Sequence, residues 1–552
     1  MGDPAGGSSR RSPATNPRAP VAERRRRPLI LGLLMILVLA GIWRAVLALR
    51  LPVIARDGVT FCRHARLLGE YGLAYLRDPN FQQHPLFPLA ILGVQRLARS
   101  YGAPDTPLTW QYSGQIICWS AGLVVILLTA ALTARLTRRL ELPVAPGRAL
   151  LIAALLAAVT DLNVWLSADV MSDQVHLAFY LGAVLLLLQL QRWWTALAVG
   201  LLSGLAFLTR EEGFVPAAAS LVALLAARRT LPRPTLFKSA TALLVGFAVL
   251  AGPYWAATGK FSPKKNPLHW LDTAVHLRNG PAPEYVSVRE FGRQPIAEAR
   301  LETLDLPWYA VLPEVLYKLL RAGRVVIPLL ALLPLVSLRN RLTHYPLVGW
   351  TCSLVGHLAL ATLLLTFHGY LSPRHLLVPV ALLTPLAALL LTRLYQLLAD
   401  LHHEGWARLA VAATLLPLLP YALRVPNSGD AYLRDAANWL QTHDAQHAEK
   451  RLLSGSGPQR LAFYANMRWE YWPEQPAEYD ALVRQIRDDG AGYFAIEVGP
   501  GFERAGNREL VARLRADAAL AQYLGHFHER PGPSPDVTLF LIELKDVPGD
   551  QK

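Results

Sequence analysis

The sequence contains few charged residues and very few cysteines. Only 17% of its 552 residues are charged and 53% are hydrophobic, which leaves too much apolar surface for an ordinary soluble protein. The 3 cysteines, Cys62, Cys118 and Cys352, form no CxxC pair, which argues against a disulfide framework and a cysteine zinc site. The chain has no GxGxxG, Walker or HExxH motif, so nucleotide hydrolysis and zincin-type proteolysis have no support.

The net charge of +15 does not indicate a nucleic-acid partner. The arginines cluster at the ends of apolar runs, a pattern that reports membrane topology and not a groove for nucleic-acid phosphates. The composition therefore predicts an α-helical polytopic membrane protein in contact with membrane lipids.

About eleven apolar runs are predicted to be membrane spans. The first run, 29–49, follows four arginines and lacks a small-residue cleavage site, so we expect it to be retained as a span. The other runs are 109–132, 149–166, 175–190, 194–208, 214–227, 240–257, 325–336, 347–367, 375–391 and 409–423.

Basic residues alternate between the connections of these spans. Few occur in the connections 167–174, 210–213 and 368–374. Because Arg and Lys collect on the cytoplasmic side, we expect a multi-pass membrane protein with a cytoplasmic N-terminus and an extracytoplasmic C-terminal part. The connections rich in Arg or Lys are 135–148, 192, 228–238, 339–341 and 393–408.

Three regions follow from this topology. Residues 1–28 are predicted to be a disordered cytoplasmic tail, and 29–424 a transmembrane domain with external loops at about 50–108 and 259–323. Residues 425–552 are predicted to be a small soluble α/β domain outside the membrane. Its expected helices are 431–441, 459–466, 479–489 and 508–524, and its expected strands are 451–454, 492–498 and 537–544.

The stretch 56–89 holds the first candidate chemistry. Asp57 directly follows the first span, so its carboxylate either caps a helix or acts as a catalytic base. His84 stands beside two prolines, just before an apolar segment that returns to the membrane. A histidine at such a junction is commonly structural, but its titration near neutral pH also suits a proton-transfer partner of Asp57.

Two later outer turns carry further charges. Asp169 and Asp173 connect two spans, where carboxylates are either helix caps or functional groups, since burying them without a partner is costly. Arg210 and Glu212 lie in the turn 209–213. They form either an ion pair that holds two helices together or, if Arg210 faces a cavity, part of a phosphate site.

The remaining candidates lie near the ends of other predicted spans. Arg374 and His375 close the outer end of a late span, where Arg374 is a second candidate for binding phosphate. Lys264 and Lys265 belong to the external segment 259–323, whose mixture of cations and aromatic residues suits the membrane interface.

In their order and common outer side, these motifs resemble the GT-C type of membrane glycosyltransferase. They are most similar to the bacterial protein O-mannosyltransferase and aminoarabinose-transferase group, or family 39. The matching patterns are an A-x-x-L helix and an H-P-L-[FY]-P turn in the first loop, D-x-x-S-[DE] in the second, T-R-x-E-G in the third and S-x-R-Y in a later turn. The chain departs from the family at Gly58, where many members carry Glu, and at His375, where they carry Tyr.

The resemblance implies transfer of a glycosyl group from a polyprenyl-phosphate sugar to a lipid, glycan or protein acceptor. Asp57 would be the base of an inverting reaction at the outer face of the inner (cytoplasmic) membrane, and Asp173, Asp169 and His84 would be further catalytic candidates. The substrate-binding candidates are Arg210, Glu212, Arg374, His375, Lys264 and Lys265.

Other interpretations stay open at this point. No cofactor is indicated with certainty, and a divalent cation is an option that the sequence does not decide. A transporter or flippase of lipid-linked sugars would have similar spans, but it should show internal repeats, and the sequence gives none that is convincing. In a non-catalytic membrane assembly protein, the C-terminal part would bind partners and Asp57 would be dispensable.

Overall fold

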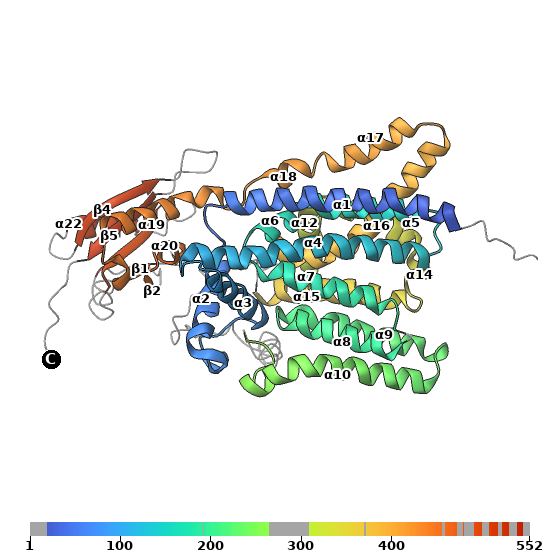
Figure 1. Cartoon of the computed structure of the whole chain (residues 1–552), viewed down its shortest axis with the longest axis horizontal. Coiled ribbons are helices and arrows are strands. Elements are labelled where there is room, and N and C mark those ends of the chain that lie inside the picture. Colours follow the sequence, from blue (N-terminus) through green and yellow to red (C-terminus); the bar gives the residue numbers. More distant parts are fainter. Residues whose placement is uncertain are drawn as a thin grey trace, which may run out of the picture.

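The computed structural model describes residues 19–190, 192–263, 308–368, 371–454, 459–471, 479, 491–498, 507–516, 521–528 and 538–544. Long helices lie side by side, and a small sheet is located beyond one end of them (Figure 1). The helix α1 (Ala19–Arg50) begins at the end of the bundle opposite to the sheet.

The first part of the bundle, up to residue 258, consists of helices joined by short connections. After α1 it contains α2 (Arg56–Tyr71), η1 (Gly72–Arg77), α3 (Leu86–Ser100), α4 (Pro107–Arg139), α5 (Pro146–Val159), α6 (Asp161–Ala168), α7 (Ser172–Leu187), α8 (Trp193–Phe207), η2 (Glu211–Phe214), α9 (Val215–Ala226), η3 (Ala227–Arg229) and α10 (Arg233–Thr258).

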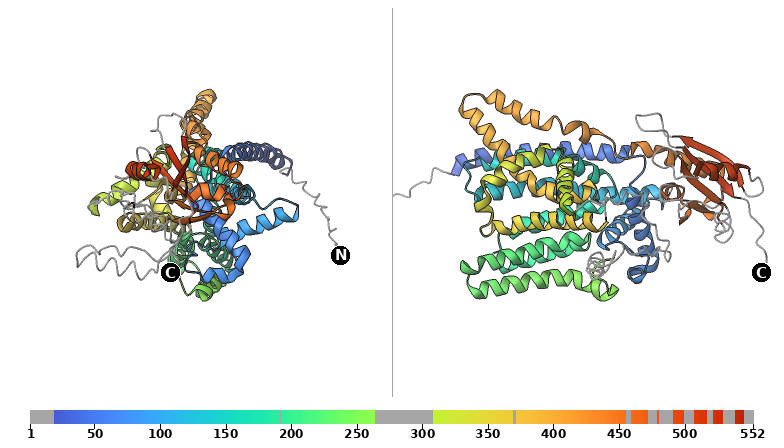
Figure 2. Two further views of the ribbon diagram at one scale, coloured as in Figure 1. Left: turned by 90° about the vertical axis from the view of Figure 1, so that its left-hand side faces the viewer. Right: turned by 180° about the vertical axis from the view of Figure 1, so that it is seen from behind.

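The second part completes the bundle and leads to the sheet. It contains α12 (Trp308–Ala322), α13 (Val326–Ser337), α14 (Arg339–Leu342), α15 (Leu347–His368), η4 (Pro373–Leu376), α16 (Leu377–Asp400), α17 (Glu404–Leu415) and α18 (Leu419–Leu423). Seen from behind, α17 and α18 run along the bundle toward the sheet (Figure 2).

The structure supports a membrane protein, but with fewer full-length spans than expected. Within the described ranges, 5 helices are long and apolar enough to cross a membrane, or 7 if two bent helix pairs each count as one span. The expected number of about eleven is not confirmed. The physical reason is length, because α7 and α8 are apolar helices of only 16 and 15 residues, and about 20 are needed to cross the hydrocarbon core.

The two bent pairs meet at a buried ion pair. The break between α5 and α6 bends the chain by 58°, and that between α12 and α13 by 116°. Arg324, at the second break, donates from Nε to Asp161 Oδ2 at the first break over 2.8 Å. A charge inside a membrane bundle needs such a partner, so this pair ties the two breaks together.

Three of the five arginine-rich connections lie close to one another. Arg341, in α14, donates to the carbonyl of Leu140 at the end of α4. The Arg148 guanidinium, at the start of α5, stacks over the ring of Tyr395 near the end of α16, 4.2 Å from its centroid. In Figure 1, α14 lies at the end of the bundle where α1 begins, so this basic end is opposite to the sheet.

The C-terminal part forms a five-stranded sheet in the order β2-β1-β3-β5-β4. Strand β1 pairs in parallel with β2 and β3, whereas β5 pairs antiparallel with β3 and β4. Apolar side chains of α19 and α20 pack on the sheet. The elements are η5 (Ser428–Asp430), α19 (Ala431–His443), η6 (His447–Glu449), β1 (Arg451–Ser454), α20 (Gln459–Tyr464), β2 (Arg468–Tyr471), β3 (Tyr493–Val498), α22 (Asn507–Ala516), β4 (Ala521–His528) and β5 (Thr538–Leu544).

Most elements expected in this part are present. The strands expected at 451–454, 492–498 and 537–544 correspond to β1, β3 and β5, and the helices expected at 431–441 and 459–466 to α19 and α20. The helix expected at 508–524 is wrong from Ala521 onward, because these residues pair with β5 as strand β4, and residues 517–520 lie outside the described residues. Almost all of the helix expected at 479–489 lies outside the described residues, and β2 was not expected.

Two other expectations concern the N-terminal tail and the segment 259–323. Residues 1–18 of the predicted disordered tail lie outside the described residues, but helix α1 already begins at Ala19, so the polar run before residue 29 continues the first apolar helix. In the external segment 259–323, the part after residue 307 is the amphipathic helix α12. Residues 264–307 of that segment lie outside the described residues.

The sheet-containing part contacts the start of the first outer loop. The hydroxyl of Tyr464 accepts the Ile54 backbone N–H over 2.9 Å and donates to Gln111 Oε1 over 2.7 Å. Arg434 donates to the carbonyl of Pro52 over 3.1 Å. These bonds fix the chain between α1 and α2, which is where the site described next begins.

Candidate active site

A pocket lies at the sheet-side end of the bundle, between α7, η2, α15 and η4. It has roughly 220 Å³ of empty space, part of which is open to solvent, and is lined by Asp173, His176, Arg210, Glu212, His357, Arg374, His375, Leu377 and Val378. The sequence candidates Asp173, Arg210, Glu212, Arg374 and His375 are thus brought together from distant parts of the chain.

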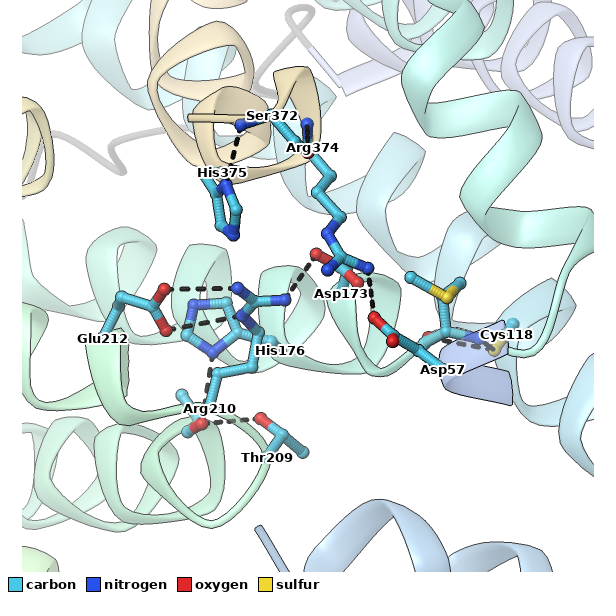
Figure 3. A network of polar contacts seen from close by, with 12 residues as sticks. Asp57, Cys118, Asp173, His176, Thr209, Arg210, Glu212, Ser372, Arg374 and His375 are labelled. Carbon is cyan, nitrogen blue, oxygen red and sulfur yellow. Dashed lines mark hydrogen bonds and ion pairs between the residues drawn. The ribbon is translucent and has the colours of Figure 1, made fainter. Parts of the chain in front are cut away.

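Asp57 joins this group through an ion pair. Its carboxylate, in the first turn of α2, contacts the Arg374 guanidinium 317 positions further along the chain (Figure 3). The N-cap position of α2 belongs to Ala55. Asp57 is 36% exposed and Asp173 only 3%, so Asp57 is the more accessible of the two acids to a substrate.

The turn between α6 and α7 sets the position of the first turn of α2. Asp169 accepts the Ala55 N–H at 3.0 Å and the Val170 N–H at 2.7 Å with Oδ1, and the Asn427 amide at 3.1 Å with Oδ2. A Cβ on Gly58 would lie 2.9 Å from the Val170 carbonyl oxygen. Glycine therefore permits the close approach of α2, which explains why the family's glutamate does not fit here.

Arg210 lies between two carboxylates. Its Nη1 is 2.7 Å from Asp173 Oδ1, and its Nη2 is 3.3 Å from Glu212 Oε1. Burial disfavours the charge of Arg210, but the attraction of Asp173 and Glu212 outweighs it and raises the guanidinium pKa. Burial likewise disfavours the Glu212 carboxylate, but Arg210 holds the pKa of Glu212 well below its usual range. Arg210 and Glu212 are therefore both charged at neutral pH.

The backbone of the turn 209–213 aims Arg210 into the pocket. The carbonyl of Ala206 accepts both the Thr209 hydroxyl at 2.6 Å and the Arg210 N–H at 2.9 Å. A Cβ on Gly213 would lie 2.1 Å from the Ala206 carbonyl carbon, so only glycine allows this fold-back. Glu211 points away from the pocket and accepts the hydroxyl of Ser262 over 2.7 Å.

Arg374 is positioned by a capping box at the start of η4. Ser372 Oγ accepts the Arg374 N–H over 3.3 Å, and His375 Nδ1 accepts the Ser372 N–H over 3.1 Å. From α12, Lys318 Nζ donates to the Leu371 carbonyl over 3.0 Å. The histidine found where the family has tyrosine therefore orients the turn that carries Arg374.

Two pocket residues, His176 on α7 and His357 on α15, were not predicted from the sequence. Both lie inside apolar runs and are only 3% and 4% exposed. The available signal was their chemistry, because an ionisable side chain within a membrane span is a functional candidate by default. His176 follows Asp173 by one helical turn and so lies on the same face of α7.

Four candidates lie elsewhere. Asp169 is outside the pocket lining, and burial raises the pKa of its carboxyl to about 6 despite the hydrogen bonds from Ala55, Val170 and Asn427. His84 is buried against the rings of Phe207 and Tyr254, with centroids 5.4 and 6.4 Å away. Lys264 and Lys265 lie outside the described residues.

In the part of the chain that the structure describes, no group of three or more His, Cys, Asp or Glu side chains is arranged to hold a metal ion. Within the pocket, the carboxylates of Asp173 and Glu212 both engage Arg210.

Neither protein-family models nor curated protein sequences match this chain. Solved structures do. The oligosaccharyltransferase of Archaeoglobus fulgidus, in complex with Zn and sulfate, has 13% identity and a TM-score of 0.55, with 83% of this chain and 67% of that chain covered. ArnT from Cupriavidus metallidurans, bound to undecaprenyl phosphate, has 12% identity and a TM-score of 0.54, with 92% and 97% covered.

A third structure, the archaeal oligosaccharyltransferase AglB from Archaeoglobus fulgidus with an inhibitory peptide and a dolichol-phosphate, has 13% identity and a TM-score of 0.54. The match covers 94% of this chain and 75% of that one. At such low identity the likeness shows the fold. The chain therefore has the GT-C membrane fold that its motifs predicted.

Proposed function

We propose that this protein transfers a glycosyl group from a polyprenyl-phosphate sugar to an acceptor at the outer face of the cytoplasmic membrane. The observation that carries the proposal is the ion pair between Asp57 and Arg374 at the pocket. It joins a partly exposed carboxylate, suited to accept a proton, with a guanidinium, suited to bind phosphate.

Arg374 is the better candidate for the donor phosphate. Its Nε is buried and has no hydrogen-bond partner among the described residues. Arg210 also lines the pocket, but its charge is already balanced by two carboxylates. In this proposal Arg374 binds a phosphate oxygen, and Arg210 contributes a more distant positive charge that stabilises the departing phosphate.

The reaction follows from these roles. An acceptor hydroxyl or amide attacks the anomeric carbon while Asp57 takes its proton, and the bond from that carbon to the phosphate oxygen breaks. The polyprenyl phosphate leaves with the bonding electron pair, and configuration at the anomeric carbon is inverted. Asp173 and Glu212 hold Arg210 in place.

The neighbours in fold support the lipid donor. Their structures contain undecaprenyl phosphate in one protein and a dolichol-phosphate in another. A lipid donor also gives a reason for placing the site in a membrane bundle, since the isoprenoid chain stays in the lipid while the phosphate reaches the interface. We propose that the acceptor is a lipid, a glycan or a protein.

The test is a transfer assay with purified protein in liposomes. Undecaprenyl-phosphate sugars are supplied together with an extract of cell-envelope acceptors, and release of undecaprenyl phosphate is measured with and without EDTA. Acceptor-dependent release supports the proposal. If EDTA abolishes this release, the reaction also requires a divalent cation. Movement of the lipid-linked sugar across the bilayer without any release would favour the flippase interpretation instead.

A further inference from the structure

The two histidines of the pocket each present one ring nitrogen that has no partner among the described residues. His176 Nδ1 lies 3.1 Å from the Ala206 carbonyl oxygen, and His357 Nε2 lies 3.2 Å from that of His375. Because a carbonyl oxygen only accepts, these two nitrogens carry the ring protons. The other nitrogens of the neutral rings, His176 Nε2 and His357 Nδ1, are then acceptors, and both are buried.

A third acceptor lies beside them. Asp173 Oδ2 is buried and has no hydrogen-bond partner in the described part of the chain, while Oδ1 of the same carboxylate engages Arg210. Tyr180 packs against both imidazoles, at 5.6 and 5.8 Å between centroids, but its hydroxyl donates to the Ser353 carbonyl over 3.1 Å. It therefore supplies no donor to the pocket.

The pocket thus contains both cations and unpartnered acceptors. Its cations are the guanidiniums of Arg374 and Arg210. Its unpartnered acceptors, called the inner side below, are His176 Nε2, His357 Nδ1 and Asp173 Oδ2. Leaving a buried acceptor without a donor is unfavourable, because the group has lost its hydrogen bonds to water. An ionised phosphate carries only acceptors and cannot satisfy the inner side, whereas a sugar ring carries several hydroxyl donors.

We infer that His176 and His357 accept hydrogen bonds from hydroxyl groups of the donor's sugar, and so select the sugar while Arg374 holds the phosphate. This inference rests on the proposed function and deepens it. It assigns the inner side of the pocket to a hydroxylated sugar ring, with two imidazoles as the specificity-determining groups.

The test compares two kinds of ligand. The probes are undecaprenyl phosphate and its mannose, glucose and N-acetylglucosamine conjugates, bound to the full-length protein in nanodiscs. The wild type should bind at least one conjugate more tightly than undecaprenyl phosphate. His176→Phe and His357→Phe should each raise the Kd for that conjugate about tenfold and leave the Kd for undecaprenyl phosphate unchanged. In His176→Phe the Ala206 carbonyl keeps its bond from Thr209.

Tyr180→Phe is the matched control, because Tyr180 touches both rings but its hydroxyl points to Ser353. It should not alter the ratio of the two dissociation constants. Unchanged binding of undecaprenyl phosphate shows that a variant is folded. If one of the two phenylalanine variants misfolds, the dissociation constants of the other variant test the inference. Equal loss for both ligand types, or no loss for the conjugate, overturns the inference but leaves the proposed function standing. A wild type that binds neither ligand overturns both.

Discussion

The Arg374 guanidinium contacts the Asp57 carboxylate although 317 positions separate them in the chain. While the pair is intact, each partner weakens the other's proposed role, because the cation disfavours proton uptake by the acid and the acid competes with phosphate for the cation. A donor phosphate that takes over Arg374 would release Asp57. Donor binding would then activate the base.

Asp57→Asn should test whether Asp57 acts by accepting a proton or only by the shape of its side chain. Asparagine preserves the size of the side chain but cannot take a proton, so turnover should fall on the order of a hundredfold or more. Binding of undecaprenyl phosphate should be unchanged or tighter, because Arg374 loses its competing anion. Turnover and Kd are measured on the same protein preparation.

Two companion variants complete this experiment. Asp173→Asn tests whether the second acid of the pocket takes part, and Asp169→Asn is the comparison outside the pocket lining. Normal transfer by the Asp57→Asn protein, with a donor that the wild type uses, would remove Asp57 from the catalytic role and favour a transporter.

The two pocket arginines should differ in their effects. Arg374→Ala should weaken binding of undecaprenyl phosphate by about tenfold or more, as expected for loss of a charge-assisted contact. Arg210→Ala should mainly destabilise the fold, by about 3 kcal/mol, because it leaves the buried Asp173 carboxylate without its cation. Binding titrations and thermal unfolding in detergent distinguish the two effects.

A double variant provides the control for Arg210. Adding Asp173→Ala to Arg210→Ala removes the unpaired charge, so the double variant should be more stable than the sum of the two single losses. If Arg210→Ala instead reduces donor affinity as strongly as Arg374→Ala at unchanged stability, Arg210 binds the phosphate directly.

The sequence predicted Asp57, Asp173, Arg210 and Arg374 on a common side of a membrane, because apolar runs and arginine-rich connections follow simple rules, and the structure places them close together. It could not show that Asp57 meets Arg374. That contact depends on how the capping box of His375 folds the turn back into the pocket.

His176 and His357 were missed for a related reason. Each is a single polar residue inside an apolar run, and only the packing of α7 against α15 brings them to one pocket. The role of Asp169 was also undecided by sequence, because its partners Ala55 and Asn427 are 114 and 258 positions away. The number of spans is not confirmed for a different reason, because apolar helices such as α7 and α8 have only 16 and 15 residues, fewer than the roughly 20 that cross the hydrocarbon core.

The predicted sidedness can be tested with fusions at both ends. A cytoplasmic N-terminus and an external C-terminus follow from the arginine-rich connections, three of which are linked through Arg341 and Arg148 at the end of the bundle opposite to the sheet. Alkaline phosphatase should be active after residue 552 and inactive before residue 19, and a cytoplasmic fluorescent reporter should give the reverse. Activity of one reporter at both ends would contradict this topology.

Asp169 should make stability depend on pH. Burial raises the pKa of its carboxyl to about 6 from an ordinary value of 3.8. The folded protein therefore holds this proton more tightly than the unfolded chain, so its contribution is present at low pH and is lost as the pH rises through about 6. Between pH 5 and pH 7 the loss is about 1 kcal/mol. Glu212, with its lowered pKa, stays ionised throughout this window.

Asp169→Asn isolates this contribution, because asparagine does not titrate. Thermal unfolding at pH 5 and pH 7 should show a smaller decrease for the variant than for the wild type. Equal decreases in the two proteins would mean that Asp169 is already ionised at pH 5.

Gly58 lies at the contact between α2 and the turn 169–171, at a position where many members of the resembled family carry glutamate. A Cβ there would lie 2.9 Å from the Val170 carbonyl oxygen and 3.1 Å from Val170 Cβ, so α2 or the turn 169–171 must shift. Gly58→Ala should therefore destabilise the protein by about 1–3 kcal/mol and lower turnover, because the shift moves the adjacent Asp57. Gly58→Glu should do the same without adding a useful acid.

Gly93→Ala is the matched control for the Gly58 variants. Gly93 lies in helix α3, and a Cβ added there would have no neighbouring atom within 4 Å, so alanine should be neutral or stabilising by up to about 1 kcal/mol. Thermal unfolding and turnover are measured for all three variants. Equal stability of Gly58→Ala and Gly93→Ala would show that the contact with Val170 does not constrain α2, and Asp57 would then owe its position to the hydrogen bonds of Asp169 alone.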